Sequence, residues 1–475
     1  MIPIKEQGLR EAVAGEYRGH LNALIANVVI DSRKVTENAL FVAMKGENVD
    51  SHRFIAQAYA SGAGCVFASR EFASSHEIDV PEGRMLVICE DPVLSMGDLA
   101  AWYRRQFQIP VVGVTGSVGK TSTKDMIAAA LSGGFKTAKT PANLNNQFGL
   151  PLTVFGLEAD TQAAVIEMGM NHFGEIRYLA HIARPDIGVL TNIGVSHIEF
   201  LGSQRGILQA KTEMLEEMDS HNMMLFCGDD PLLAEYAASC KVPHLMYGFG
   251  EANDVRCTAS KQDGDILEAE IRYLDEPAVT VRANTIGNHM VYAMLAAYAA
   301  GRLTGLTPEQ IREGIAGYTA TGMRMESITT DQYRIIDDSY NASPASMKAA
   351  IDVICKEKAA AGRRAVAILG DMFEMGFYSE TGHREVGAYA AEKGVDLLLT
   401  AGSDSRYIAE EAAAQNKGTE IHSYKTLEEL KADLFSRVRS GDIILVKASR
   451  RMAFDTLVPL LEKGPQTDAV GKEEP

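Results

Sequence analysis

The amino-acid sequence predicts an α/β protein with mostly parallel sheets, divided into three domains at residues 1–88, 89–319 and 320–475. The length of 475 residues is too great for one core and fits a few domains. From Pro110 onward, short apolar runs alternate with helix-like segments, which is the pattern of a parallel sheet covered by helices. A second alternation of the same kind begins near residue 320. Together, these observations predict the fold class.

The first predicted domain is a small α/β unit over residues 1–88. Apolar runs predict strands at 41–43 and 65–67, with a helix at 54–60 between them. A helix at 95–107 then leads into the second domain.

The central domain, residues 89–319, is predicted to contain a mostly parallel sheet. Residues 254–284 change to alternating apolar and polar positions, which predicts a small antiparallel segment. Strands are expected at 111–115, 163–168, 187–193, 223–227 and 244–248, and helices at 122–131, 176–182, 206–218, 289–302 and 308–317.

The third domain, residues 320–475, is predicted to be a Rossmann-like, doubly wound unit. A disordered tail is expected from about residue 464, where the sequence becomes polar and rich in Gly and Pro. Strands are expected at 333–337, 364–370, 396–401 and 442–447, and helices at 344–357, 379–393, 404–415, 426–437 and 452–463.

Composition excludes several classes of partner. The net charge of −17 argues against nucleic acid or an anionic membrane surface. No apolar run is long enough to span a bilayer, and the first twenty residues lack the apolar core of a signal peptide. The six cysteines form no CxxC pair, which is typical of reduced thiols. These features predict a cytoplasmic protein without membrane insertion.

A glycine-rich loop between a strand and a helix carries the clearest chemical signal. Residues 110–126 read PVVGVTGSVGKTSTKDM, in which an apolar strand is followed by small residues, Lys120 and Thr121. This layout predicts a P-loop-type domain, because glycines let backbone N–H groups surround phosphate oxygens at a helix N-terminus. A glycine turn after a strand can also be purely structural, but the Lys-Thr pair favours nucleotide binding. The expected ATP-binding residues here are Thr115, Gly116, Ser117, Gly119, Lys120, Thr121 and Ser122.

Other candidates lie at strand ends. Glu167 follows an apolar strand, and a carboxylate there commonly holds the Mg²⁺ of a phosphate loop, with Thr121 as a second ligand. His197 also follows an apolar strand, and Lys211 lies on a helix. From the residues alone, a structural histidine and a solvated lysine are the favoured interpretations, and the same applies to Arg324 and Asp338.

Seven segments together resemble the Mur ligases: TGSVGKTSTK, TPANLNNQFGLPLTV, VIEMGMNHFGEI, TNIGVSHIEFLGS, AKTEML, DDSYNASPASM and LGDMFEMG. The resemblance extends to DSRKVTENALFVAMKGE near the N-terminus and LVKASRRM near the C-terminus, so it covers nearly the whole chain. DDSYNASP and LGDMFEMG resemble the members of the family that add a D-alanyl-D-alanine dipeptide.

The resemblance implies an ATP-dependent amide ligase that joins D-alanyl-D-alanine to UDP-N-acetylmuramoyl-tripeptide in cytoplasmic peptidoglycan precursor synthesis. In the family, the substrate carboxylate becomes an acyl phosphate, the dipeptide amine attacks it, and ADP and phosphate leave. The first domain holds the UDP end of the substrate, the central domain binds ATP, and the third domain brings the dipeptide. A monomer is expected.

The resemblance also implies roles for individual residues. Two Mg²⁺ ions are expected, with Thr121, Glu167, His197 and Lys211 as ligands and Lys211 carbamylated to N6-carboxylysine. Lys120, Lys211, His197 and Arg324 are the expected catalytic residues, and Asn288, Arg324 and Asp338 complete the ATP site. The expected substrate-binding residues are Ser32, Arg33, Lys45, Asn143, Asn145, Asn146, Asn341, Asp371 and Glu374.

One helix departs from the family pattern. The family's adenine-side helix usually reads GxHNxxNxLAA, whereas this chain has Met290 and Ala293 at the two asparagine positions. Alternative interpretations stay open at this point: a ligase that adds diaminopimelate or lysine, a folylpolyglutamate synthase, a P-loop switch or motor ATPase, and a non-catalytic binding protein.

Overall fold

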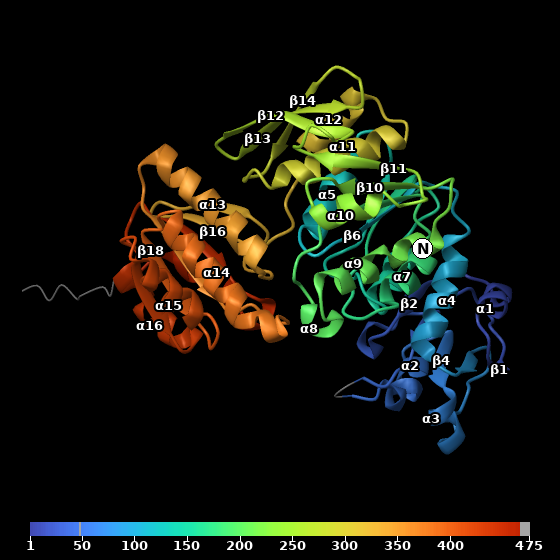
Figure 1. The fold of residues 1–475 in the computed structure, drawn as a ribbon. Helices are drawn as coiled ribbons and strands as arrows, with labels where there is room; N and C mark the ends of the chain where they lie inside the picture. The colour runs from blue at the N-terminus through green and yellow to red at the C-terminus, as the bar shows by residue number, and fades with distance from the viewer. Residues whose placement is uncertain (47–48, 466–475) are drawn as a thin grey trace, which may run out of the picture.

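The computed structural model describes residues 1–46 and 49–465 and contains three sheets. Figure 1 shows the central unit between the other two, with the N-terminal unit in blue and the C-terminal unit in orange and red. The three sheets match the predicted fold class. The domain boundaries at 88/89 and 319/320 remain predictions. The proposed tail falls on residues 466–475, which lie outside the described residues, although Gly464 and Pro465 are described.

The N-terminal sheet has five strands in the order β1-β5-β4-β3-β2. Only β1 is antiparallel to its neighbour. The strands are β1 Glu16–Gly19, β2 Asn27–Val29, β3 Ala39–Val42, β4 Cys65–Ser69 and β5 Met85–Cys89. The helices are α1 Glu6–Ala12, α2 Ile55–Ala60, α3 Arg70–Ser75 and α4 Pro92–Arg104, with 3-10 turns at Ser32–Lys34 and Ser51–Phe54.

The central sheet has nine strands in the order β14-β13-β12-β11-β10-β9-β6-β8-β7. Its parallel strands are β6 Val111–Thr115, β7 Thr137–Lys139, β8 Ala163–Glu167, β9 Ile187–Leu190, β10 Met223–Cys227 and β11 His244–Gly248. Strand β6 lies between β8 and β9, so the loop that follows it emerges at the middle of the parallel part. The loop after β6 and the ends of β8 and β9 therefore meet at one edge of the sheet.

The strand predicted at 187–193 ends early, at Leu190. The next residues turn toward the glycine loop instead, because Ser117 N–H donates to Asn192 O at 3.0 Å and Val118 N–H donates to Asn192 Oδ1 at 2.9 Å. The backbone after β9 thus supports the loop after β6.

The antiparallel segment extends the central sheet as β12 Val255–Asp263, β13 Ile266–Tyr273 and β14 Val279–Asn284. The central helices are α5 Lys120–Leu131, α6 Gly149–Phe155, α7 Glu175–Ala183, α8 Ile198–Leu201, α9 Gln204–Thr212, α10 Pro231–Ala237, α11 Met290–Leu303 and α12 Pro308–Ala316. The helix predicted at 206–218 is shorter, since residues Glu213–Glu217 form a 3-10 turn.

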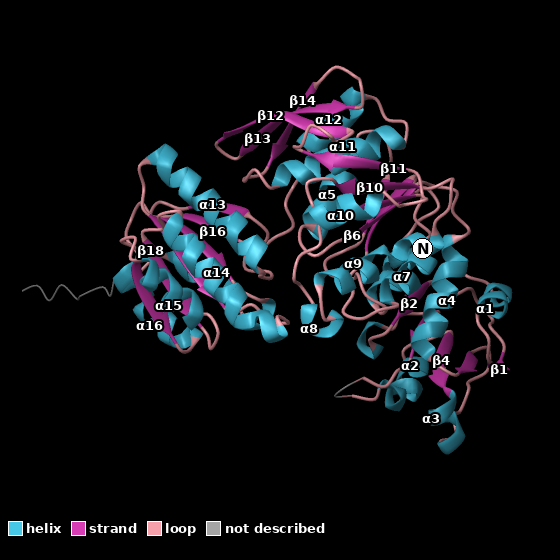
Figure 2. Cartoon of the chain, viewed as in Figure 1, coloured by secondary structure: helices cyan, strands magenta, loops and turns pink. Residues whose placement is uncertain are grey.

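The C-terminal sheet has the order β15-β16-β20-β17-β18-β19, and all pairs except β15–β16 are parallel. Figure 2 shows it as a separate group of strands with helices around it. The strands are β15 Glu326–Thr329, β16 Arg334–Asp337, β17 Ala365–Gly370, β18 Leu397–Ala401, β19 Glu420–Tyr424 and β20 Ile443–Lys447. The helices are α13 Pro344–Ala361, α14 Ser379–Glu392, α15 Arg406–Gln415, α16 Leu427–Arg437 and α17 Val458–Lys463, with a 3-10 turn at Gly376–Tyr378.

Strand β17 explains why this unit is doubly wound. Alternate residues face two different cores: Ala367 packs in a core with residues of α13, α14 and α15, whereas Ile368 packs in a core with residues of α16 and α17. A strand that is buried on both faces reads as a continuous apolar run, as AVAIL does here.

The helix predicted at 452–463 forms only in its second half. Ala453 has a left-handed φ of 53°, which interrupts the helix between 3-10 turns at Arg450–Met452 and Phe454–Leu457. Helix α17 then begins at Val458, with Pro459 in its first turn, where a missing N–H is tolerated.

Candidate nucleotide and substrate site

The glycine loop links β6 to α5 at the carboxyl end of the parallel strands of the central sheet. Gly116 has a φ of 152°, and a Cβ atom there would lie 1.8 Å from Thr191 Oγ1, so only glycine fits. Gly119 has a left-handed φ of 82° and is the N-cap of α5. The helix begins at Lys120, two residues before the predicted start, and directs its N-terminus at the loop.

The half-buried Lys120 and the buried Lys211 converge on one carbonyl of this loop. Lys120 Nζ donates to Gly116 O at 2.8 Å, and Lys211 Nζ donates to the same oxygen at 3.0 Å. Burial lowers the pKa of Lys211 well below its usual value, and repulsion from Lys120 lowers it further. Burial is also the main cause of the lowered pKa of Lys120. The lowered pKa values mean that charging both amines at this place is costly, and a bound anion would reduce that cost.

Glu167 ends β8 opposite the start of α5. Its carboxylate accepts hydrogen bonds from Thr121 Oγ1 at 2.8 Å and from Asn145 Nδ2 at 2.7 Å. Thr121, Asn145 and Glu167 all line the main cavity. A hydroxyl and a carboxylate are the hard oxygen ligands that Mg²⁺ prefers, so these residues fit one such ion beside a phosphate. Among the described residues, no three or more His, Cys, Asp or Glu side chains cluster in a way that could hold a metal ion by themselves.

Several buried polar atoms around the loop have no hydrogen-bond partner within residues 1–46 and 49–465. They include Thr115 Oγ1, Ser117 Oγ and Arg324 Nε. Burying a polar group without a partner costs roughly 1–3 kcal/mol, so such atoms commonly face a ligand. The residues present therefore fit a bound polyanion such as a nucleotide triphosphate.

The third unit contributes a second basic group. Lys447 is at the end of β20. Its Nζ lies 2.5 Å from Asp338 Oδ2 and donates to Asn341 O at 2.8 Å. Its side chain is 2% exposed. Arg324 comes from the segment between the two units and stacks on Tyr340, with its Cζ 3.9 Å from the ring centroid. All of these residues line the main cavity.

His197 and Glu374 meet across the two units, with Nδ1 and Oε2 2.8 Å apart. Both have left-handed backbones, with φ of 64° and 62°. Burial lowers the pKa of His197, while the contact with His197 holds the pKa of Glu374 below its ordinary value. The pair places a third-unit carboxylate beside the candidate metal ligand.

The loop that carries Glu374 is held by hydrogen bonds to other parts of the third unit. Met372 N–H donates to His383 Nε2 at 2.9 Å, and Phe373 N–H donates to Ser449 Oγ at 2.9 Å. Asp371 is 3% exposed, and its carboxylate accepts four hydrogen bonds from residues 403–405. Asp371 therefore holds the loop rather than facing the cavity, which differs from its expected position in the substrate pocket.

The main cavity has a volume of about 690 Å³ and is lined by the central and third units together. It brings together most of the predicted residues, namely Ser117, Gly119, Lys120, Thr121, Ser122, Asn143, Asn145, Asn146, Glu167, His197, Arg324, Asp338 and Asn341. Sequence reasoning missed Asp229, Asp230, Tyr247, His289, Tyr292 and Lys447, which also line it. For Lys447, its position at a strand end was an available signal.

Asn288 lies elsewhere. It is exposed, and its Oδ1 accepts a hydrogen bond from Ser260 Oγ at 2.7 Å. Its neighbours on α11 line the cavity instead, with Tyr292 Oη donating to Asp229 Oδ2 at 3.0 Å. Met290 and Ala293, at the two positions where the family has asparagine, are also lining residues. No asparagine of α11 reaches this part of the described cavity.

The predicted residues of the N-terminal unit do not line the main cavity. Ser32, Arg33 and Lys45 lie near turns of this unit. The exposed Arg33 pairs with Asp31 at 2.8 Å and lowers the pKa of Asp31 to about 2. This pairing does not require a ligand.

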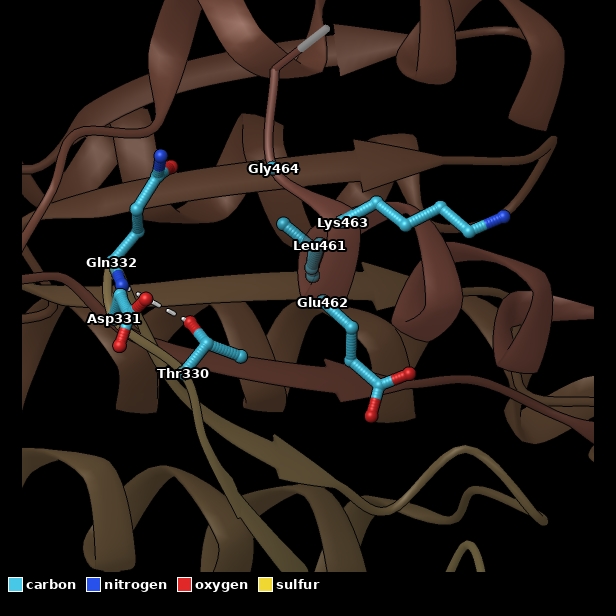
Figure 3. A pocket seen from close by; sticks show the side chains of 7 residues that line it. All are labelled: Thr330, Asp331, Gln332, Leu461, Glu462, Lys463 and Gly464. Atoms are coloured by element: carbon cyan, nitrogen blue, oxygen red, sulfur yellow. Dashed lines mark hydrogen bonds between the residues drawn. The ribbon is translucent and has the colours of Figure 1, made fainter.

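A second cavity, of about 320 Å³, lies in the third unit and is shown in Figure 3. A turn at residues 330–332 forms one side, where Gln332 N–H donates to Thr330 Oγ1 at 3.2 Å, and the end of α17 forms the other. It shares no lining residue with the main cavity.

None of the described helices is both long enough and apolar enough to cross a membrane.

Comparisons with known proteins agree over the whole chain. Residues 24–104 match the family model "Mur ligase family, catalytic domain", residues 114–301 match "Mur ligase middle domain", and residues 323–450 match "Mur ligase, glutamate ligase domain". A UDP-N-acetylmuramoyl-tripeptide–D-alanyl-D-alanine ligase of Bacillus subtilis is 37% identical over 468 residues, covering 98% of this chain and 100% of the relative.

Two solved structures are also similar. A crystal structure of MurF from Acinetobacter baumannii has a TM-score of 0.86 and 28% identity, covering 97% of this chain and 99% of its own. A MurF ligase from Thermotoga maritima in complex with ADP has a TM-score of 0.80 and 28% identity, covering 92% and 97%.

Proposed function

Because this chain belongs to the Mur ligase family, we propose that it is an ATP-dependent amide ligase that joins D-alanyl-D-alanine to UDP-N-acetylmuramoyl-tripeptide. The observation that carries the proposal is the Bacillus subtilis relative, which has this activity in its name and aligns over its full length. The cavity supports it, since the phosphate loop and residues of the third unit line one space.

The reaction has two steps that both involve anions. A carboxylate oxygen of the tripeptide attacks the terminal phosphorus of ATP, the bond to the bridging oxygen breaks, and ADP and an acyl phosphate form. The dipeptide amine then attacks the acyl carbon, loses a proton, and inorganic phosphate leaves with the C–O bond electrons. Bringing a carboxylate to a triphosphate requires cations, and Lys120 and Arg324, which both line the cavity, supply them.

We propose that two Mg²⁺ ions assist this chemistry. Thr121 and Glu167 would hold one ion, and His197 with Lys211 the other. When bound, such ions neutralise phosphate charge and polarise the phosphoryl oxygens. Asn145 orients the Glu167 carboxylate through its hydrogen bond at 2.7 Å.

Lys211 suits a carbamate. An ammonium cannot ligate a cation, whereas a neutral amine can add CO₂ and lose a proton to become an anionic carbamate. The Lys211 side chain is 1% exposed, and its lowered pKa favours the neutral amine that reacts with CO₂.

We propose domain roles to match. Residues 1–88 would hold the UDP end of the substrate, with Ser32, Arg33 and Lys45 as candidates. Residues 89–319 would bind ATP and the tripeptide carboxylate near Asn143, Asn145 and Asn146, and residues 320–475 would present the dipeptide near Asn341 and Glu374. We further propose a cytoplasmic monomer, a location that the six free cysteines support.

A substrate panel tests the proposal. Phosphate release should require ATP, the tripeptide nucleotide and D-alanyl-D-alanine together, and single amino acids should not replace the dipeptide. Tripeptide nucleotides with diaminopimelate or with lysine at the third position of the peptide are compared in parallel. Lys120→Ala should lose ADP release and product together, by about 100-fold or more. Steady ATP turnover without an amine acceptor would indicate a switch or motor ATPase instead.

A further inference from the structure

A buried ionic cluster behind the phosphate loop has no role in the chemistry above. Lys124 and Asp125, on α5, have side chains that are each 1% exposed, and neither lines the main cavity. Asp125 Oδ1 lies 3.2 Å from Lys124 Nζ and 2.7 Å from Lys139 Nζ. The other oxygen, Oδ2, accepts a hydrogen bond of 2.5 Å from Thr321 Oγ1. Burying charges at this position requires compensation, which the two lysines provide.

Thr321 belongs to the segment that joins the central unit to the third unit. The hydrogen bond from the Thr321 hydroxyl to Asp125 therefore fixes this segment to α5. Lys120 and Thr121 are the first residues of that helix. Hydrogen bonds of 2.5–2.7 Å between a hydroxyl and a carboxylate are among the stronger ones in proteins.

Met323 and Met325, which follow Thr321 in the same segment, are hydrogen-bonded to the third unit instead of to α5. Met323 O accepts a hydrogen bond from Tyr340 N–H at 3.2 Å, and Met325 N–H donates to Asp338 Oδ1 at 3.2 Å. Met323 and Met325 both have left-handed backbones, with φ of 63° and 51°. Such a conformation is costly for methionine and persists only when its surroundings enforce it. Gly322 is the one residue between the two sets of attachments.

Arg324 lies three residues beyond Thr321, between the two strained methionines. Its guanidinium is near enough to Lys120 to lower the pKa of that lysine by repulsion, after burial as the larger cause. Its guanidinium stacks on Tyr340 of the third unit, and three residues before it Thr321 is fixed to α5.

We propose that Asp125 is a positioning residue: by holding Thr321 it fixes the segment between the units and directs Arg324 at the nucleotide phosphates. The inference rests on the proposed nucleotide site. Asp125 touches neither nucleotide nor substrate, and it acts through Thr321 and Arg324.

Thr321 allows a sharper test than Asp125, whose removal would take a carboxylate away from Lys139 and leave Lys124 with Glu167, 4.0 Å away, and Thr140 O. Thr321→Val removes the hydroxyl and keeps the shape, whereas Thr321→Ser keeps the hydroxyl. Binding of the Mg²⁺ complex of the β,γ-imido analogue of ATP to the full chain is measured by calorimetry. We expect Thr321→Val to bind about tenfold more weakly, as loss of a charged hydrogen bond implies, and Thr321→Ser to stay within about twofold of the wild type.

A double-mutant cycle tests whether Thr321 affects nucleotide binding through Arg324. In an Arg324→Ala background, Thr321→Val should cause no further loss of binding beyond about twofold. Wild-type affinity in Thr321→Val, or equal losses with and without Arg324, would overturn the proposal. If Thr321→Val does not fold, Thr321→Ala replaces it in the same cycle. Nucleotide binding is measured without the peptide substrates, so failure of the ligation assay would be seen separately from failure of this inference.

Discussion

At Lys211, burial of the side chain bears directly on the chemistry proposed for its amine. Its amine is buried with Gly116 O as its hydrogen-bond acceptor, and no carboxylate is among the causes that shift its pKa. Burial and the nearby Lys120 both disfavour the ammonium form of such a lysine. The proposed carbamate would convert it into an anion between the phosphate loop and His197, which explains why an amine would occupy a metal site.

We predict that Lys211→Ala loses activity by about 100-fold or more and regains part of it when acetate or propionate is added. The removed side chain leaves space in which a short carboxylate can take the place of the carbamate. Ligation rates with and without the added acid provide the measurement. Lys261→Ala, at an exposed position of β12, is the matched control and should respond to neither change. Absence of rescue, together with an unmodified Lys211 in a map of active enzyme, would contradict the carbamate.

Single residues differ in how far the sequence predicts them. Glu167 was predictable because it ends an apolar strand next to a glycine loop, and parallel strand ends share one edge. Asp229 and Tyr292 were not, because they meet through a tertiary hydrogen bond between residues 63 positions apart. Asp371 shows the opposite case: its motif predicts a place in the substrate pocket, whereas its carboxylate accepts hydrogen bonds from backbone N–H groups of residues 403–405, which the motif does not indicate.

Among the elements, the loop after β17 has the most defined support. Residues 371–374 are held by His383, Ser449 and the loop after β18, so Glu374 reaches His197 from a rigid base. The His383 ring accepts Met372 N–H through Nε2, and its Nδ1 lies 2.7 Å from Ser379 O. This arrangement requires a neutral ring with its proton on Nδ1.

We predict that His383 makes the stability of the protein depend on pH. Burial lowers the pKa of His383 below the ordinary value near 6.5 that the unfolded chain retains. Above that value both states are neutral. As the pH falls below it, the unfolded state takes up a proton first, so the free energy of unfolding decreases by at most about 1.4 kcal/mol for each pH unit.

Denaturant unfolding of wild type and His383→Gln between pH 5 and 8 measures this effect. Glutamine can accept the same N–H without titrating, so the stability difference between the two proteins should change below about pH 6.5 and stay constant above it. A difference that is the same at every pH would contradict the assignment of a neutral His383.

Three of the strands that sequence reasoning missed share a physical cause. Strands β7, β15 and β19 are short edge strands with mostly exposed or half-buried residues. An edge strand pairs on one side only and does not need the apolar run that identifies a central strand such as β17. Most fully buried strands, such as β6, β8 and β17, were predicted to within a few residues, whereas the fully buried β5 was missed although its apolar run MLVIC was an available signal.

At the scale of the whole molecule, ion pairs at two places are among the contacts that join the central and third units. His197 meets Glu374 on one side, and Asp265, between β12 and β13, pairs with Arg334 of β16 on the other. The main cavity is lined by both units, although its phosphate loop belongs to one and Asp338 and Lys447 to the other. A ligand that contacts both sets of residues gains binding energy only when the two units are close.

We therefore predict that nucleotide and substrate together reduce the size of the protein in solution. Small-angle scattering of the full chain, alone and with the ATP analogue plus the tripeptide nucleotide, measures the radius of gyration. The value should fall for the wild type, because Arg324 and Asp338 are drawn toward the bound phosphates. Lys120→Ala is the control: having lost the cation that holds the terminal phosphates, it should keep the larger radius under the same conditions. Equal radii for the wild type with and without ligands would mean that the two units already hold their final arrangement, and that ligand binding selects no more compact state.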